Sequence, residues 1–276
     1  MNTLDTTPPV PGGAALESLH ADLARDGVGR AAGLVPDALC DAARAEIDRF
    51  GNFGTDPESW YARLAGDERL PLHQSQAFWD IRQLPGIHEL FRAVLGTPFL
   101  WVTVDGPTFR PPERDGDRTG SPFRWDVDPR RSDRRVQGLV YLDDCAAEQG
   151  AFRCVPAIYR NPEAWRAVHG IAPFEAERLR PEAIREVAGR RGDLVLWDAR
   201  LPHGTGPNRL DRPSYGLPVT LFPEGDERRR RERVEDFEAR RPPAFHRGRP
   251  GQRDPEPGPV PRLSELGEHL LGRRPW

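Results

Sequence analysis

The residues that could carry out chemistry in this chain lie in two short segments far apart in the sequence. The first contains Arg124, Asp126 and Asp128, and the second contains His203 within the sequence Leu-Pro-His-Gly. Alternate residues of a β-strand share one face, so an extended first segment would direct a guanidinium and two carboxylates to the same side. Buried charges of this kind need a metal ion, a ligand or each other. The proline and glycine would hold His203 on a fixed turn.

Two interpretations of these residues are open at this point. Asp126 and His203 offer a carboxylate and an imidazole, which are common metal ligands. Alternatively, Arg124 and Asp126 form an ion pair that only braces a loop. Which interpretation holds depends on the elements that position the two segments.

The composition predicts a sizeable core together with long irregular segments. The chain has 276 residues, with 30 Pro and 27 Gly that favour loops, and seven Trp and twelve Phe that can fill a core or a pocket. All 40 basic residues are arginine, but the net charge is -3, which argues against a general affinity for nucleic acid. We predict no nucleic-acid partner.

The cysteine content and the N-terminal residues predict a cytoplasmic protein. Three cysteines, Cys40, Cys145 and Cys154, are too few for a disulfide framework. The first residues lack the basic and apolar regions of a signal peptide. No apolar run approaches the roughly 18 residues that a membrane span needs.

The chain divides by sequence character into three regions. Residues 1–13 are rich in Pro and Gly and are predicted to be disordered. Residues 14–223 are predicted to form a single domain with helices at its N-terminal end. Residues 224–276 are predicted to contain a charged helix, a Pro-rich linker over 242–261 and a terminal helix that packs on the core.

Apolar spacing and turn residues predict helices first and short strands afterwards. The helices are expected at 14–25, from Pro36 to Gly51, at 76–83 and 86–95, with helical insertions at 161–169 and 175–186. The strands are expected at 99–105, 123–127, 136–142, 151–155, 193–198 and 215–222. This order predicts an α+β fold with an antiparallel sandwich or open barrel.

Several stretches match a known family in residue type and spacing. They lie at 73–80, 101–105, 125–129, 136–142, 148–156 and 192–208. On these stretches the chain resembles bacterial members of the phytanoyl-CoA dioxygenase family of Fe(II)/2-oxoglutarate oxygenases. The resemblance implies a double-stranded β-helix, a jelly-roll or cupin-like core, with flanking helices.

The resemblance also shows where this chain departs from the family. In the family a His-x-Asp pair and a distal His bind iron, whereas here Arg124 stands in place of the first His. Asp126 and His203 fall on the two remaining ligand positions. A guanidinium cannot donate a lone pair and would repel Fe²⁺, so we predict that these vestigial metal positions hold no metal.

The cosubstrate positions depart from the family as well. The resemblance predicts an Arg about eleven residues after the distal His, where it would hold the far carboxylate of 2-oxoglutarate. That position is Ser214, and Arg212 could replace it only if the strand register or a bulge allows. With Gln137 and Arg110, these residues make up the predicted vestigial 2-oxoglutarate site.

Our first hypothesis is an enzyme that needs neither metal nor cofactor and acts on a small organic or secondary-metabolite substrate. Its chemistry would be cyclisation, isomerisation, elimination or hydrolysis. Asp126 and His203 would exchange protons with the substrate, and Arg124 would neutralise a carboxylate or an oxyanion. The predicted pocket residues are Trp101, Trp125, Asp128, Trp197 and Tyr215.

Two alternatives stand beside it. A catalytically silent homologue would bind and stabilise an active oxygenase or another pathway protein, as part of a hetero-oligomer. An ordinary Fe(II)/2-oxoglutarate hydroxylase would complete its metal site with a residue from elsewhere, such as His73 or Asp128. A homo-oligomer is compatible with each hypothesis.

Overall fold

The computed structural model describes residues 12–61, 69–114, 120–249 and 251–276. Most of the N-terminal segment that is predicted to be disordered, residues 1–11, lies outside this description. Eight α-helices are described: α1 (Gly13–Asp26), α2 (Asp37–Gly51), α3 (Gln76–Arg82), α4 (Pro85–Leu95), α5 (Pro156–Arg160), α6 (Pro162–His169), α7 (Glu227–Glu238) and α8 (Glu265–Leu271). The division of the chain into domains stays a prediction.

The helices at the N-terminal end form where apolar spacing predicts them. The α1 helix ends at Gly27 and α4 ends at Gly96, and both glycines have a φ of 73° that other residues rarely adopt. Pro85 opens α4, because a first-turn proline loses no hydrogen bond there.

The strands are short and pair antiparallel in three sheets. The described strands are β1 (Val28–Ala31), β2 (Leu100–Val102), β3 (Thr108–Arg110), β4 (Val136–Tyr141), β5 (Phe152–Cys154), β6 (Arg185–Val187), β7 (Leu194–Asp198), β8 (His203–Thr205), β9 (Ser214–Pro218) and β10 (Leu221–Pro223). The first sheet has the order β1-β7-β4-β9-β3, the second is β10-β2, and the third is β6-β5-β8. The predicted α+β class with antiparallel strands is confirmed.

Several sequence-based expectations about individual elements are wrong. Strands β1, β3, β6 and β8 are absent from the prediction, because each is short and lies outside the longer β-rich runs from which the other strands were predicted. The predicted strand at 123–127 is reduced to isolated bridges at Phe123 and Arg124. The predicted helix at 175–186 is instead two 3₁₀ turns, Ala176–Arg178 and Pro181–Ala183, followed by β6.

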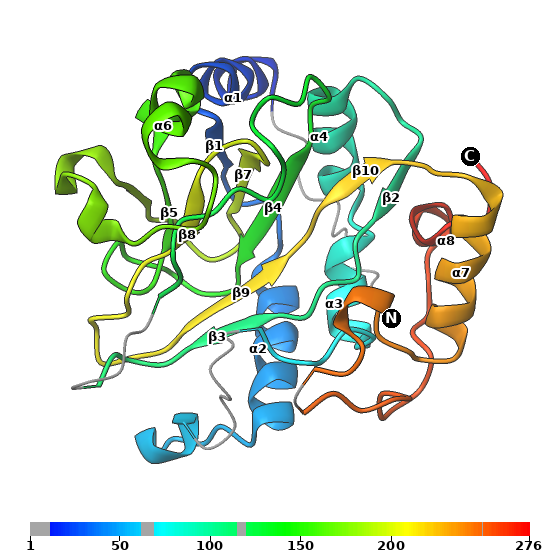
Figure 1. Cartoon of the computed structure of the whole chain (residues 1–276). Coiled ribbons are helices and arrows are strands. Elements are labelled where there is room, and N and C mark those ends of the chain that lie inside the picture. The colour runs from blue at the N-terminus through cyan, green and yellow to red at the C-terminus, as the bar shows by residue number, and fades with distance from the viewer. Residues whose placement is uncertain (1–11, 62–68, 115–119, 250) are drawn as a thin grey trace.

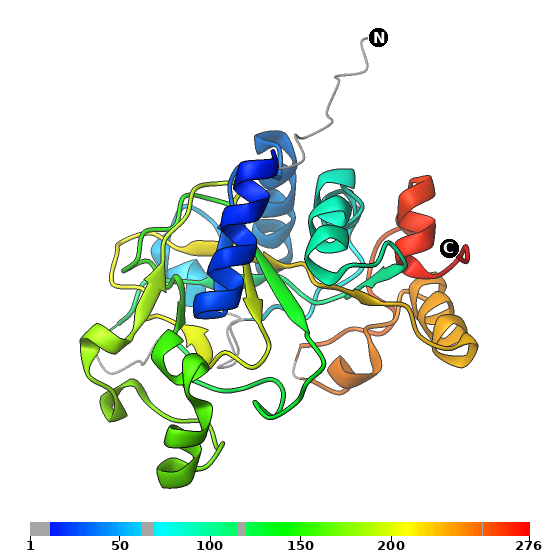
Figure 2. The same ribbon diagram turned by 90° about the horizontal axis from the view of Figure 1, so that it is seen from above.

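The five-stranded sheet is covered on both faces. Leu194 and Leu196 of β7 point into a core that they share with helices α1, α2 and α4, which lie along one side of the sheet (Figure 1, Figure 2). Val195 and Trp197 alternate with them and point to the other face, where they meet Phe152 of the three-stranded sheet. The space between these two sheets is where the predicted site residues lie.

The C-terminal region lies beside the two-stranded sheet. Helices α7 and α8 lie next to each other there, near β2 (Figure 1). The Pro-rich stretch after α7 contains a 3₁₀ turn, Ala244–His246, and the last residue of this turn, His246, is buried. Within the described residues, no helix is both long and apolar enough to cross a membrane.

Candidate active site

A cavity of about 1130 Å³ opens between the five-stranded and three-stranded sheets. Its wall includes residues from β3, β4, β5, β7, β8 and β9, so it depends on the closure of both sheets. Pockets for small organic molecules commonly measure roughly 300–1000 Å³, so this cavity can take a substrate of ordinary size. The predicted site residues that line it are Arg110, Arg124, Asp126, Gln137, Trp197, His203, Ser214 and Tyr215.

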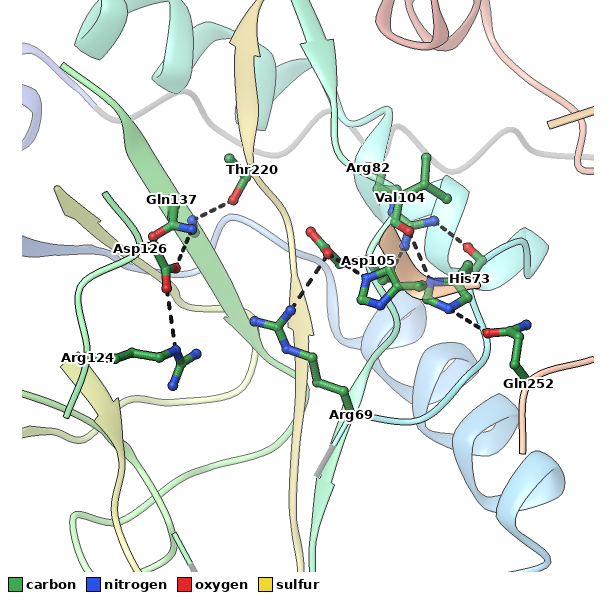
Figure 3. A network of polar contacts seen from close by, with 12 residues as sticks. Arg69, His73, Arg82, Val104, Asp105, Arg124, Asp126, Gln137, Thr220 and Gln252 are labelled. Carbon is green, nitrogen blue, oxygen red and sulfur yellow. Dashed lines mark hydrogen bonds and ion pairs between the residues drawn. The ribbon is translucent and has the colours of Figure 1, made fainter. Parts of the chain in front are cut away.

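Asp126 lies at the centre of a cluster of donors in this cavity (Figure 3). The Nε of Arg124 lies 3.4 Å from its Oδ1. Its Oδ2 accepts a 2.8 Å hydrogen bond from Nε2 of Gln137 and lies 3.5 Å from Nε2 of His203. Both carboxylate oxygens are therefore engaged by side chains of the protein.

The pKa of Asp126 follows from these surroundings. Burial by itself would raise the pKa, but the neighbouring imidazole, amide and guanidinium outweigh it, and the pKa falls well below its ordinary value. The group is therefore a carboxylate at neutral pH.

His203 is fixed by its backbone and by one ring nitrogen. Its backbone pairs with Arg124, and each residue donates a 3.0 Å hydrogen bond to the carbonyl of the other. Nδ1 lies 2.9 Å from the carbonyl oxygen of Leu201, which can only accept, so Nδ1 carries the proton in the neutral ring. Nε2 faces Asp126 and the cavity, and it can donate to Oδ2 of Asp126 only in the charged ring.

The close approach of β8 to the Arg124 segment depends on Gly204. A Cβ at Gly204 would lie 2.8 Å from the carbonyl oxygens of both Ser121 and Pro122, closer than real contacts allow. Replacing Gly204 with alanine is therefore expected to lower the free energy of unfolding by about 1–3 kcal/mol, measured in urea. The matched control is Gly206→Ala, whose Cβ would meet nothing closer than 3.5 Å. Equal losses in the two variants would contradict this interpretation.

The predicted cosubstrate positions are only partly brought together. Arg110 of β3 stands directly opposite Ser214 of β9 in the antiparallel register, and both line the cavity. Arg110 is 4% exposed, donates to the carbonyl oxygen of Gly150 at 2.6 Å, and burial lowers its pKa to about 10. Arg212 is not among the lining residues, and its guanidinium donates to Oε1 of Gln149 at 3.4 Å, so its conditional cosubstrate role stays a prediction.

Three of the predicted pocket residues lie elsewhere. Asp128 binds Arg130 through its side chain and is not among the residues that line the cavity, because the segment is not an extended strand. Trp125 packs on Phe174, with ring centroids 5.6 Å apart. Trp101 lies in the two-stranded sheet under Arg233, whose guanidinium carbon is 5.3 Å from its ring. Only Trp197 and Tyr215 line the cavity as predicted.

Four residues of the cavity wall, three of them charged, are absent from the sequence-based prediction of the site. Arg69, Asp105, Phe245 and Arg249 line the wall as well, and Figure 3 shows Arg69 between Asp105 and the Arg124–Asp126 pair. Asp105 ends an alternating β-rich stretch, and this pattern could have indicated a polar residue at a cavity wall. Phe245 and Arg249 lie in Pro-rich sequence, which gives no signal for a cavity wall.

Comparison with known proteins identifies the family. The sequence profile described as phytanoyl-CoA dioxygenase (PhyH) matches residues 23–213, which is more than half of the chain. The chain belongs to the phytanoyl-CoA dioxygenase family. The predicted family membership is thereby confirmed.

Individual relatives are distant. A probable alpha-ketoglutarate-dependent hypophosphite dioxygenase of Stutzerimonas stutzeri is 29% identical over 112 residues, which cover 36% of this chain and 37% of that protein. The match therefore spans little more than a third of this curated relative.

Solved structures share the fold. The epimerase SnoN, in complex with Fe3+, alpha ketoglutarate and nogalamycin RO, superposes with a TM-score of 0.57 at 20% identity, covering 92% of this chain and 97% of that chain. GIG2 (DUF1479) from Candida albicans superposes with a TM-score of 0.72 at 13% identity, covering 93% and 76%. At these identities the likeness is one of fold.

The iron that the family implies does not fit the residues of this cavity. Of the three positions predicted for the iron ligands, two hold Asp126 and His203, but the third holds the guanidinium of Arg124, which has no lone pair to give a metal and lies 3.4 Å from the carboxylate. His73 and Asp128, the expected substitutes, do not line the cavity. Across residues 12–61, 69–114, 120–249 and 251–276, no group of three His, Cys, Asp or Glu side chains is placed to hold a metal ion.

Proposed function

We propose that the protein is an enzyme that performs non-oxidative acid–base chemistry on a small organic substrate, without a metal, in the cavity of a jelly-roll scaffold. One observation carries the proposal: protein donors engage both oxygens of Asp126, and one of them is the cation Arg124, 3.4 Å away. A metal would have to break these contacts and then lie beside a fixed positive charge.

The same contacts suit proton transfer. Nε2 of His203 faces the cavity with its tautomer set by Leu201, so it can take a proton from a substrate and return it. Asp126 stays ionised and stabilises the imidazolium that forms. The electron pair left on the substrate moves to a carbonyl or carboxylate oxygen, and Arg124, with a side chain 35% exposed, can neutralise that charge. Isomerisation and elimination use these steps directly, and cyclisation or hydrolysis could use the same pair.

The family setting supports a role in small-molecule modification. SnoN is named an epimerase, so a reaction whose outcome is isomerisation is already associated with this fold. That structure holds Fe3+ and alpha ketoglutarate, whereas we propose that Arg124 and Ser214 stand at the predicted ligand and cosubstrate positions of this chain and disfavour both. Fold does not determine function, so the residues of the cavity carry the proposal.

A deuterium-exchange screen tests it. Chelator-treated protein is incubated in D₂O with a panel of carboxylic acids, and mass spectrometry follows deuterium incorporation at carbon. Asp126→Asn and His203→Gln are each expected to slow the exchange by about 10²- to 10⁴-fold. Asp128→Asn, outside the cavity, is the matched control and should have little effect.

The ordinary oxygenase is the second candidate, because Asp126 and His203 remain at ligand positions of the family. It predicts that the native protein takes up Fe²⁺ at micromolar concentration and consumes 2-oxoglutarate. That result, together with no exchange by metal-free protein, would overturn the proposal. Exchange that both variants leave unchanged would overturn it too.

A further inference from the structure

Phe245 and Arg249 line the cavity from the C-terminal region of the chain, past strand β10. The family match ends at residue 213, and the described lining residues beyond it are Ser214, Tyr215, Gly216, Pro218, Thr220, Phe245 and Arg249. The last two lie more than 30 residues past that end, so the family match does not account for this side of the wall.

The turn that carries Phe245 is fixed by the buried side chain of the next residue, His246. His246 is 2% exposed, its Nε2 lies 3.2 Å from Oδ1 of Asp105, and its ring centroid lies 4.6 Å from that of His73. Phe245, the preceding residue, is 65% exposed. An aromatic side chain that is fixed on a rigid turn at a cavity and left exposed is a contact surface for an apolar group.

The chain on either side of this turn is also built into the fold. The side chain of Glu256, 3% exposed, accepts hydrogen bonds of 2.8 Å from the backbone N–H groups of His73 and Gln74. Arg240 donates to the carbonyl oxygen of Gln74 at 2.9 Å and to that of Glu256 at 2.9 Å. These contacts attach the chain to the core before and after the turn, and they fix the positions of Phe245 and Arg249 in the cavity wall.

The cavity carries an excess of positive charge among its described lining residues. Four arginines and two aspartates line it, which leaves two positive charges when histidine is neutral: Arg69, Arg110, Arg124 and Arg249 against Asp105 and Asp126. Arg249 follows Phe245 by four residues, and Nη1 of Arg69 lies 3.8 Å from Oδ1 of Asp105, the same oxygen that His246, the neighbour of Phe245, approaches at 3.2 Å. Such a site favours anions.

We propose that Phe245, Arg249 and Arg69 form a recognition wall for an organic anion with a planar apolar body. The apolar body would pack on Phe245, and the carboxylate or phosphate would bind the two arginines. The inference rests on the proposed function only in placing the reacting atoms near Asp126 and His203, because binding requires no turnover.

Calorimetric titration with 2-naphthoate and with its uncharged amide, 2-naphthamide, tests the recognition wall. The native protein is expected to bind the acid at least about tenfold more tightly than the amide. Phe245→Ala and Arg249→Ala are each expected to weaken binding of the acid by about tenfold or more. Phe99→Ala and Arg253→Ala, at exposed positions outside the cavity, are the matched controls.

Three outcomes would overturn the recognition wall. They are no binding of the acid by the native protein, equal binding of acid and amide, and equal losses in the wall variants and their controls. Circular dichroism of each variant separates loss of binding from loss of fold. Because the readout is binding, the results that would overturn the acid–base proposal would leave this one standing.

Discussion

Replacing Arg124 with histidine is expected to raise the affinity of the protein for divalent metal ions. Arg124 and His203 lie opposite each other and exchange two backbone hydrogen bonds. In antiparallel pairs of this kind the two Cα atoms are about 5.5 Å apart. A histidine at 124 would therefore add an imidazole beside Asp126 and His203 and remove a positive charge. We expect binding to tighten by at least about 100-fold, followed anaerobically by calorimetry with Fe²⁺ and by the absorbance of Co²⁺.

The control separates the added ligand from the lost charge. Arg124→Gln removes the charge without supplying an imidazole, so it should improve metal binding far less than Arg124→His. If the native protein binds Fe²⁺ as tightly as Arg124→His, the arginine does not block the site. That result would favour the ordinary oxygenase.

Acidification from pH 7 to pH 5 is expected to lower the free energy of unfolding by about 2 kcal/mol through His73 alone. Burial lowers the pKa of His73 to about 4, helped by the nearby charges of His246 and Arg82 and opposed by Asp105. The unfolded chain, with an ordinary value of 6.5, binds a proton in this window while the folded chain does not. The contribution of His73 is therefore present above the unfolded pKa and is lost as pH falls.

Urea denaturation at the two pH values measures this effect. In His73→Gln the loss between pH 7 and pH 5 should be smaller by about 2 kcal/mol, because the titrating group is gone. His169→Gln, at an exposed position of α6, controls for removal of a histidine. A pH dependence that His73→Gln leaves unchanged would show that another group is responsible.

The fold could be predicted where local sequence carries enough signal. Helix α4 has a proline at its start, an apolar stripe and Gly96 at its end, so its bounds follow from neighbouring residues. Strand β8 has only three residues and gains its pairing from β5 and the Arg124 segment, which lie far away in the chain. No local pattern could reveal it.

The residues of the candidate site also fall into those that the sequence predicts and those that only the structure places. The resemblance to the family connects Asp126 with His203 and marks Arg124 as a predicted departure from the family pattern. The expectation that Asp128 would join them is wrong, because it assumed a regular strand and the chain turns instead after Asp126. The failed pocket predictions for Trp101 and Trp125 have a related cause, since residue type does not tell which side of a sheet a tryptophan faces.

The sequence by itself was enough to predict the family, which the family match confirms. Through the same resemblance it predicted two departures, Arg124 in place of a histidine and Ser214 in place of an arginine. Residue types and their spacing along the chain carry that much. Only the tertiary structure decided that Arg110 stands opposite Ser214, that donors engage both oxygens of Asp126, and that Phe245 reaches the cavity. These facts depend on cross-strand register and on the packing of the C-terminal segment, which are contacts between residues far apart in the chain.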